Sequence, residues 1–291
     1  MVSRKSQFTA GAIDLSLAMF ALTTLAFSAG CNVLDFVPLA SASKTVSEVF
    51  ATGNAPEIIV ETYNGQIDIS PSDRDEVVVE VTKHASGFDQ PEAEANLDRI
   101  QVTMTQVGNK IHISAQRSGM HHGNSGAAIV IATPAASLLQ LKTSNGKIVC
   151  EAMEGRVEAH SSNGKLEVVQ AKGPMKLTTS NGNIEIVATE AIVDARTSNG
   201  RIEFQGTLAD RNQTFKTSNG GIVLALPADS QFDLDCSTSN SRVSCAFNVK
   251  GEHNKRRTKL KGAVGDNPTY SITATTSNGS IDIRKAVVSA D

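Results

Sequence analysis

The fold is decided by residues 141–204, which read LKTSNGKIVCEAMEGRVEAHSSNGKLEVVQAKGPMKLTTSNGNIEIVATEAIVDARTSNGRIEF. The triplet Ser-Asn-Gly occurs four times in this stretch, and the spacing between its copies is constant. Further along, the gaps between copies are 20, 21 and 38, and the last gap equals two units of 19. The sequence therefore predicts a serial repeat of about 18 residues. The Asn of each copy, including the degenerate Ser239-Asn240-Ser241, is Asn145, Asn163, Asn181, Asn199, Asn219, Asn240 and Asn278.

Apolar residues alternate with polar ones on both sides of the triplet, which is typical of half-buried strands. The column two and four residues after Gly begins with Ile148 and Cys150 and ends with Ile281 and Ile283. The column five and three residues before Ser begins with Leu139 and Leu141 and is interrupted only at Gln213. Each unit is thus two short strands joined by an Asn-Gly turn, and we expect that turn to use the positive φ angles that these residues tolerate.

Stacked two-strand coils define a parallel β-solenoid, an all-β fold in which each inward side chain lies on its counterpart in the next coil. The alternative is an antiparallel meander, because Asn-Gly also favours hairpins. An open meander leaves one apolar face uncovered, so the solenoid is favoured. Stacked Asn and Thr side chains at the corner are expected to hydrogen-bond along the axis.

The rest of the chain divides around this array. We expect an amino-terminal β cap and first coil over residues 57–140. Around the turn Tyr63-Asn64-Gly65, the apolar residues Ile58, Val60, Ile67 and Ile69 occupy the same positions as in the later repeats. Longer strands are expected near residues 77–81, 100–105 and 111–115, with a short helix at 91–98. Residues 141–285 are the regular repeats, and 286–291 form a tail.

The amino terminus predicts export. Residues 1–30 carry Arg4 and Lys5 before an apolar stretch of about 13 residues, which is short for a membrane span and fits a signal peptide. Ser28-Ala29-Gly30-Cys31 resembles a bacterial lipobox, so Cys31 is the expected lipidation site and 31–56 the tether. Cleavage after Ala40-Ser41-Ala42, or an uncleaved anchor, are the alternatives.

The chain as a whole resembles a bacterial family of β-strand repeats of unknown function whose members are described as candidate adhesins. The features that carry the resemblance are Tyr63-Asn64-Gly65, the strand pair with its short acidic helical insert, and the serial Thr-Ser-Asn-Gly repeats over residues 57–285. The resemblance implies a β-helical fold and an envelope location, and it brings no catalytic residues.

Composition limits the function classes. The chain has 27 Lys and Arg against 30 Asp and Glu, so no nucleic-acid-binding surface is expected. Aromatic residues make up only 4%, which leaves little material for sugar recognition by stacking. No cofactor motif is present, and His121 and His122 lack spaced metal-ligand partners. Enzymatic activity is therefore not expected, although β-helix enzymes that act on glycans are a rival by fold analogy.

Three candidate sites remain. Glu167, Glu185 and Glu203 share one outward column and are weak candidates for a divalent cation or for raised pKa values, against ordinary neutralisation by Lys165 and Arg201. Cys236 and Cys245 are the candidate disulfide, against buried free thiols. A basic run predicts contact with an anionic partner, against a solvated loop that discourages edge pairing: Lys250, Lys255, Arg256, Arg257, Lys259 and Lys261.

The functional expectation is a non-catalytic lipoprotein of the bacterial cell envelope, anchored to the membrane by lipid, and located in the outer membrane or periplasm if the cell is Gram-negative. It would act as an adhesin-like scaffold or interaction module for an envelope polymer, a lipid surface or a protein partner. The alternatives are an envelope-stress sensor and a glycan-active β-helix enzyme.

Overall fold

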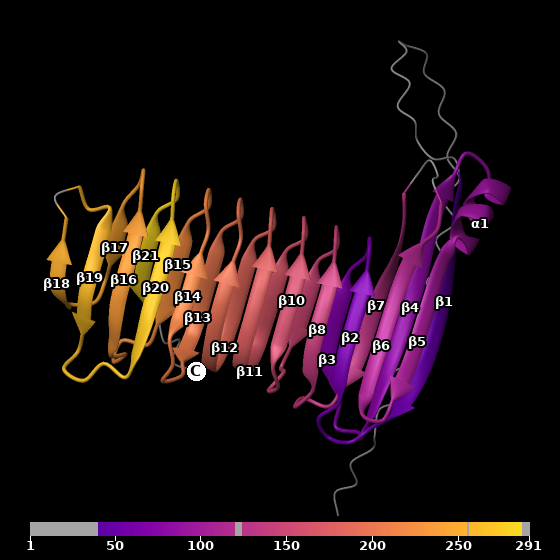
Figure 1. Ribbon diagram of the computed structural model, residues 1–291, viewed down its shortest axis with the longest axis horizontal. Helices are drawn as coiled ribbons and strands as arrows, with labels where there is room; N and C mark the ends of the chain where they lie inside the picture. The colour runs from indigo at the N-terminus through magenta and orange to yellow at the C-terminus, as the bar shows by residue number, and fades with distance from the viewer. Residues whose placement is uncertain (1–39, 120–123, 255, 287–291) are drawn as a thin grey trace, which may run out of the picture. The chain divides into compact units, whose positions relative to one another are not determined.

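The computed structural model describes residues 40–119, 124–254 and 256–286, which belong to the compact unit Pro38–Asp291. Within them the regular secondary structure is strand apart from one short helix, so the all-β prediction is confirmed (Figure 1). The expected signal peptide, Cys31, His121, His122, Lys255 and residues 287–291 lie outside the described residues.

Strands that precede the repeated turns form one sheet, which we call the leading sheet. It includes the carboxyl-terminal halves of two long strands that bend between the sheets, β11 (Leu166–Thr179) and β12 (Ile184–Arg196). In hydrogen-bonded order its other strands are β5 (Ile100–Val107), β6 (Lys110–Arg117), β2 (Glu57–Thr62), β8 (Leu138–Thr143), β10 (Val157–Ser161), then β14 (Gln213–Lys216), β20 (Tyr270–Thr276), β16 (Phe232–Thr238), β19 (Lys259–Val264) and β18 (Val249–His253).

Strands that follow the turns form the trailing sheet, which contains the amino-terminal halves of β11 and β12. In hydrogen-bonded order its other strands are β1 (Ala40–Ala51), β4 (Glu76–Gly87), β7 (Ser125–Thr133), β3 (Ile67–Pro71), β9 (Ile148–Glu151), then β13 (Ile202–Leu208), β15 (Ile222–Leu226), β21 (Ile281–Lys285) and β17 (Val243–Cys245). One leading strand and the trailing strand after it make one rung.

Neighbouring rungs pair in parallel, which contradicts the meander alternative and confirms the predicted stacking of successive copies. In the leading sheet Leu139 is opposite Val157, which is opposite Met175, so the same position of successive units is aligned. In the trailing sheet Leu166, Ile184 and Ile202 are aligned in the same way. The antiparallel pairs lie at the two ends, where β1, β4 and β5 cap one end and β18 and β19 the other.

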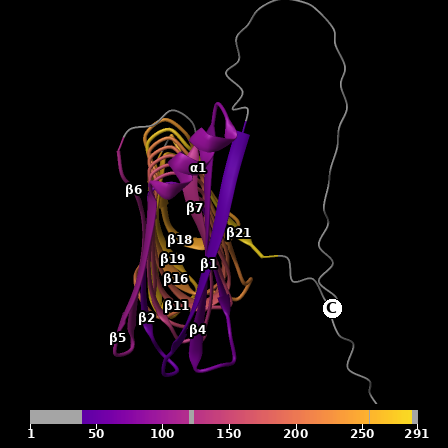
Figure 2. The same ribbon diagram turned by 90° about the vertical axis from the view of Figure 1, so that its right-hand side faces the viewer.

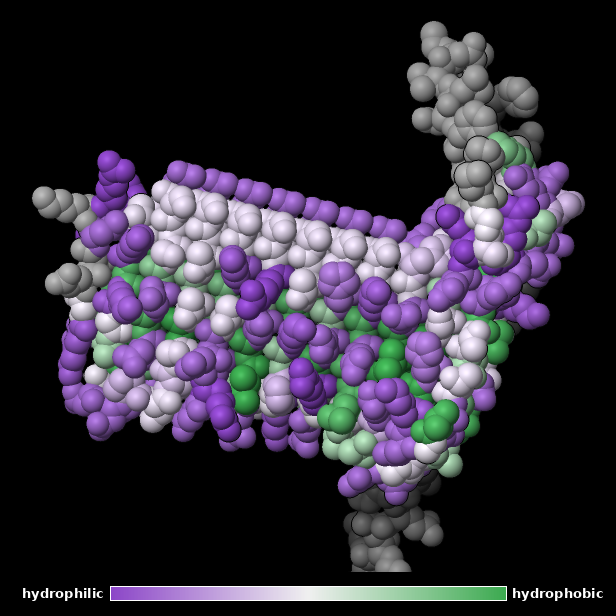
Figure 3. Space-filling view, in the orientation of Figure 1, coloured by the Kyte–Doolittle hydropathy of each residue, from purple (hydrophilic) through white to green (hydrophobic). Residues whose placement is uncertain are grey.

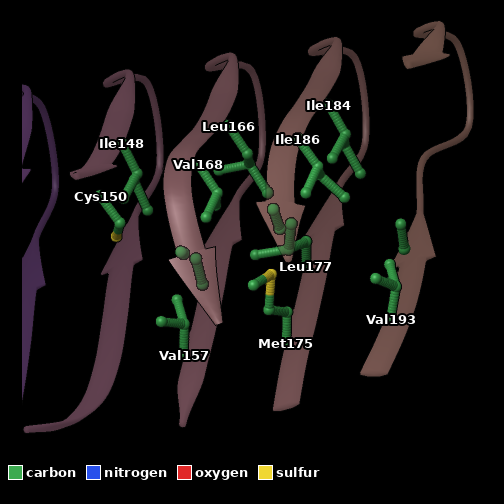
Figure 4. Close-up of a cluster of buried hydrophobic side chains, with 14 of the residues drawn as sticks. Ile148, Cys150, Val157, Leu166, Val168, Met175, Leu177, Ile184, Ile186 and Val193 are labelled. Carbon is green, nitrogen blue, oxygen red and sulfur yellow. The ribbon is translucent and has the colours of Figure 1, made fainter. Parts of the chain in front are cut away.

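The apolar columns of both sheets point into a shared interior. Figure 4 shows Ile148, Leu166 and Ile184 of the trailing sheet facing Val157 and Met175 of the leading sheet. All of these side chains are buried, and they belong to one hydrophobic cluster that extends from Phe50 to Ile283. Burial of aliphatic side chains at about 1.5–3 kcal/mol each is therefore the main stabilising term of the array.

A buried hydroxyl connects each turn to the turn before it. In six copies the Thr or Ser side chain donates to the Gly carbonyl of the neighbouring rung at 2.9–3.1 Å and accepts from the Gly N–H of its own turn at 2.8–3.3 Å. The residues are Thr143, Ser161, Thr179, Thr197, Thr217 and Thr276. A buried polar group is acceptable here because both of its hydrogen-bonding roles are used.

The turn glycines are required by close approach of the backbone, so the expectation of positive φ is wrong. None of the Asn or Gly residues of the repeated triplets is among the positive-φ residues. A Cβ placed on Gly146, Gly164, Gly182, Gly200, Gly220 or Gly279 would lie only 1.6–1.9 Å from the carbonyl oxygen of the neighbouring turn's Gly. Stacking thus leaves no room for any side chain at this position.

The predicted Asn ladder is present along the outer edge of the turns. In the spatial order 145, 163, 181, 199, 219, 278 and 240, each Asn side chain donates from its amide nitrogen to the amide oxygen of the Asn before it, at 2.6–2.7 Å. The space-filling view shows this edge as a straight hydrophilic row (Figure 3). Such amide ladders satisfy donors and acceptors along the stacking axis, as in cross-β structures.

The carboxyl-terminal rungs are not stacked in sequence order, which corrects the interpretation of the longest gap as two consecutive units. Strands β20 and β21 pair with β14 and β15 on one side and with β16 and β17 on the other. The chain therefore builds the outermost rung, turns back through the β18–β19 hairpin, and fills the rung that it had left open. The strand Ile281–Ile283, expected at the end of the stack, lies inside it.

The amino-terminal cap extends further than the sequence predicted. Residues 40–51, assigned to the 31–56 tether, form β1, whose twelve residues all pair with β4 and bury Phe50. The strand was missed because its side chains are mostly exposed and show no regular alternation. The predicted helix is α1 (Gln90–Asp98), which begins at an Asp89 cap bonded to the Glu92 N–H at 2.9 Å.

Candidate interaction surfaces

The acidic column is neutralised by neighbouring cations. Lys165 contacts Glu167 at 3.1 Å and Glu185 at 2.7 Å, while Arg201 contacts Glu203 at 2.9 Å. Lys147 also pairs with Glu167, at 2.8 Å. These hydrogen bonds, first from Lys147 and then from Lys165, lower the pKa of Glu167, the opposite of the rise that three unpaired carboxylates would produce.

The described residues contain no group of three or more His, Cys, Asp or Glu side chains that could hold a metal ion. The three glutamates share a column, but their carboxylates are used in ion pairs with Lys and Arg. The column is best described as a charged surface whose opposite charges alternate between rungs.

The basic run forms the hairpin that covers the last rung. The backbone carbonyls of Arg257 and Thr258 accept from Val243 and Thr238 at 2.9 Å, as a further rung would. Lys250 pairs with Asp266, and Lys261 with Asp235 at 3.4 Å. Of the predicted cations within the described residues, Arg256, Arg257 and Lys259 remain as an exposed cluster near the loop. Part of the run therefore closes the stack, and Arg256, Arg257 and Lys259 are exposed to solvent, as are the side chains of the paired Lys250 and Lys261.

The candidate disulfide residues are free thiols. Cys236 of β16 is buried and Cys245 of β17 is partly buried, one on each side of the last turn. Burial, with a smaller contribution from Cys245, raises the pKa of Cys236 to about 12. Burial likewise raises the pKa of Cys150 to about 12. These thiols are protonated near neutral pH and are poor nucleophiles.

Sequence reasoning missed a series of hollows on the outer face of the leading sheet. One hollow, of about 360 Å³, is lined by β2, β8 and β10, and a second, of about 330 Å³, by Arg156, just before β10, and by β11, β12 and β14. Arg156 lines both. Two further hollows lie on the same sheet near its ends, one beside Tyr63 and Arg117 and one between β16, β19 and β20.

Apolar atoms and paired charges share this face. Leu138, which lines the first hollow, is 45% exposed, and Pro174 and Ile192 line the second hollow. Figure 3 shows apolar patches between hydrophilic side chains across the middle of the face. The charges that surround the hollows are in ion pairs: Lys176 with Glu158 at 2.6 Å, Arg156 with Glu158 at 3.8 Å, and Arg196 with Asp194 at 2.7 Å. The only feature of the sequence that could have indicated these hollows is the set of outward-facing residues that alternate with the apolar columns.

The stacked two-sheet fold with paired surface charges defines a class of repeat scaffold, and the sequence of the chain matches the profile of one protein family. The Toastrack DUF4097 family profile covers residues 48–284, and the chain belongs to that family. No curated protein matches the chain. No helix within the described residues has the length and apolar character needed to span a membrane.

Solved structures resemble the chain at low identity. A candidate cell adhesion protein from Clostridium sporogenes is 12% identical, with 83% of this chain and 100% of that chain covered and a TM-score of 0.35. A candidate adhesin from Bacteroides fragilis is 13% identical, with 82% and 97% covered and a TM-score of 0.36. A candidate lipid-binding protein from Parabacteroides distasonis is 15% identical, with 83% and 97% covered and a TM-score of 0.43.

Proposed function

We propose that the protein is a non-catalytic, adhesin-like interaction module of the bacterial envelope that binds an extended polymer along the leading sheet. The observation that carries this proposal is the position of the two central hollows, which share Arg156 and continue across the strands from β2 to β14. Six strands spaced about 4.8 Å apart give a binding face about 24 Å long. That length suits several units of a linear polymer rather than one small molecule.

The chemistry of the face favours a partner with little net charge. Lys176 and Arg196 are each paired with a carboxylate, so recruiting them to an ionic ligand costs an existing contact. Apolar atoms of Leu138, Pro174 and Ile192 provide contact area, and polar side chains of neighbouring rungs provide hydrogen-bond donors and acceptors. The rigid stack presents these groups at fixed spacing, which lowers the ordering cost of binding.

The proposal includes attachment of the protein to the membrane through lipid on Cys31, with residues 1–30 removed as a signal peptide. Its support is the order of a basic start, a short apolar stretch and small residues before Cys31. Radiolabelled palmitate should be incorporated into the wild-type protein and not into a Cys31→Ala variant. Incorporation that persists in the variant would contradict the proposal that Cys31 carries the lipid.

The binding face is tested by two matched double variants. Arg156→Ala with Ile192→Ser changes the residues between and inside the hollows, whereas Arg201→Ala with Val187→Ser makes the same kind of change on the trailing sheet, where Val187 is 43% exposed. In sedimentation with purified uncharged envelope polysaccharides, we expect about tenfold weaker binding for the first variant only, equivalent to roughly 1.4 kcal/mol. Equal binding by both variants contradicts the assignment of the face.

Absence of catalysis is tested on the same polymers. Incubation with the protein is expected to release no new reducing ends and no unsaturated products. Release of either by the wild-type protein would favour the glycan-active alternative.

A further inference from the structure

We propose that strand β5 is an association edge, through which two copies of this chain pair antiparallel to form a dimer with a continuous leading sheet. The proposal rests on the position of an uncharged, self-complementary strand at the end of the stack, where one side of its backbone lacks a partner strand among the described residues. It concerns the cap and is independent of the polymer-binding face.

Among the described strands, four stand at the edges of the two sheets, because each pairs with one neighbour only: β1, β5, β17 and β18. Three of them carry features that oppose association. Strand β1 contains Lys44 and Glu48, β18 contains Lys250 and Glu252, and β17 is only three residues long. Charges and short length are the usual means by which proteins prevent edge-to-edge pairing.

Strand β5 has none of these features. Its sequence IQVTMTQV contains no charged residue, no Pro and no Gly, and it is rich in β-branched side chains. Its inward residues Val102 and Met104 pack against the core, while Val107 is 80% exposed. A segment of this composition, left open at an edge, is the kind that pairs with another strand.

The backbone register identifies which groups of β5 are free. The Arg99 carbonyl accepts from the Ser118 N–H at 3.1 Å, which places residues 99, 101, 103, 105 and 107 in hydrogen-bonded pairs with β6. The even-numbered residues then direct their N–H and C=O groups away from β6. The Ile100 carbonyl accepts from Lys83 at 3.2 Å, so the groups left without a backbone partner among the described residues are those of Val102, Met104 and Gln106.

The ends of β5 are held in place, so the edge is preorganised. The Gln106 side chain donates to the Ala51 carbonyl at 2.8 Å, and Asn109 of the adjoining turn bonds Gly53 and Ala55. Figure 2, which looks onto the cap, shows β5 along one side, with α1 near the upper end of the cap and away from the β5–β6 turn. A partner strand can therefore approach the carboxyl-terminal part of β5.

The sequence of β5 fits a two-fold axis through Met104. In that register Met104 pairs with its own copy, Val102 with Gln106, and Thr103 with Thr105, and each pair has both side chains on the same face. The pairs of even-numbered residues are also those that exchange hydrogen bonds, as the free groups require. A two-fold interface needs such self-complementarity, which favours a second copy over an unrelated strand.

The experiment uses charges on the exposed Thr103 and Thr105, which leave the core untouched. Analytical ultracentrifugation of the full-length protein in mild detergent is expected to show a concentration-dependent dimer. Thr103→Lys with Thr105→Lys places like charges opposite each other twice, and the dimer dissociation constant should rise at least tenfold. Thr103→Lys with Thr105→Glu places opposite charges across the same pairs and should keep the wild-type constant within about threefold.

A matched control places Ser43→Lys with Ser47→Lys on β1 and should leave dimerisation unchanged. A wild-type protein that stays monomeric overturns the proposal. So does a dimer that survives two lysines on β5, or one that the β1 control abolishes. Equal loss in the Lys/Lys and Lys/Glu variants overturns the register. Circular dichroism of each variant should match the wild type, since all four changed positions are exposed.

Discussion

Replacing Gly220 by Ala is expected to destabilise the protein strongly, whereas the same change at the adjacent Gly221 is expected to be tolerated. A Cβ on Gly220 would lie 1.8 Å from the Gly200 carbonyl oxygen, far inside the 3.0 Å below which real Cβ atoms essentially never approach a neighbour. A Cβ on Gly221 meets its nearest atom, the Ser280 carbonyl oxygen, at 3.3 Å. Neither glycine has a positive φ, so the comparison isolates the close approach of the turns.

The loss in the free energy of unfolding follows from the hydrogen bonds that would break when the Gly220 turn moves away from the neighbouring turn. At this turn the Thr217 hydroxyl donates to the Gly200 carbonyl at 2.9 Å, and the Asn219 N–H donates to the Ser198 carbonyl at 2.9 Å. The Asn219 side chain also donates to Asn199 at 2.7 Å. At about 1 kcal/mol net for each bond, the loss is about 3 kcal/mol, a large share of the roughly 5–15 kcal/mol of a typical domain.

Urea unfolding followed by circular dichroism measures the free energy of unfolding of the two variants and the wild type. We expect a loss of about 3 kcal/mol for Gly220→Ala and a change within about 0.5 kcal/mol for Gly221→Ala. Equal effects at the two positions, or a fully stable Gly220→Ala variant, would refute the reasoning that stacked turns exclude a side chain.

Three further predictions follow from the same structure. Thr179→Val keeps the shape of the buried side chain but removes both of its hydrogen bonds, and it should cost about 1–3 kcal/mol in urea unfolding, with Thr179→Ser costing less. The pKa of Glu167 is lowered in the folded state, so the Glu167 carboxylate stabilises the fold above its ordinary pKa of 4.5, and this stabilisation is lost as the pH falls through the lower folded value. Lys165→Met removes one of the two cations that lower this pKa. The variant should therefore lose less stability than the wild type between pH 5 and 3. With a thiol reagent at pH 8, Cys150 should stay unreacted in the native protein and become reactive in urea, and faster native labelling of Cys150 than of the partly buried Cys245 would contradict its placement in the core.

The repeated part of the fold was readable from the sequence because each rung repeats the same physical demands. Ile184 and Ile186 alternate with polar residues because one face of each strand is buried, and Thr179 recurs because the turn needs a buried hydroxyl. The helix expected at 91–98 is observed at Gln90–Asp98, and the Pro at its start is a local signal of the kind that a sequence carries.

The order of the last rungs was not readable, because their inward columns are interchangeable. Ile281 and Ile283 suit the same interior positions as Val243 and Cys245, and the residue pattern does not say which pair lies against β15. One signal was present. Ser241 replaces the turn Gly, and the last turn of a stack has a neighbour on one side only and therefore more room to move.

The hollows that carry the functional proposal were also beyond the sequence. Arg156, Pro174 and Ile192 occupy outward positions that look like ordinary surface residues of separate units. They become neighbours only because successive rungs stack in register. The acidic column was visible in the sequence, but its pairing with Lys147 and Lys165 depends on side-chain reach between rungs.

The sequence by itself determined that this protein is built of stacked two-strand units, because alternation of apolar residues and a recurrent turn are local properties of the chain. Only the tertiary structure decided how the stack is closed: β1 joins the cap, the final segment enters between earlier rungs, and the basic hairpin covers the last one. These choices depend on which surfaces remain open once the repeats have paired. That is a property of the assembled sheets, and no single unit encodes it.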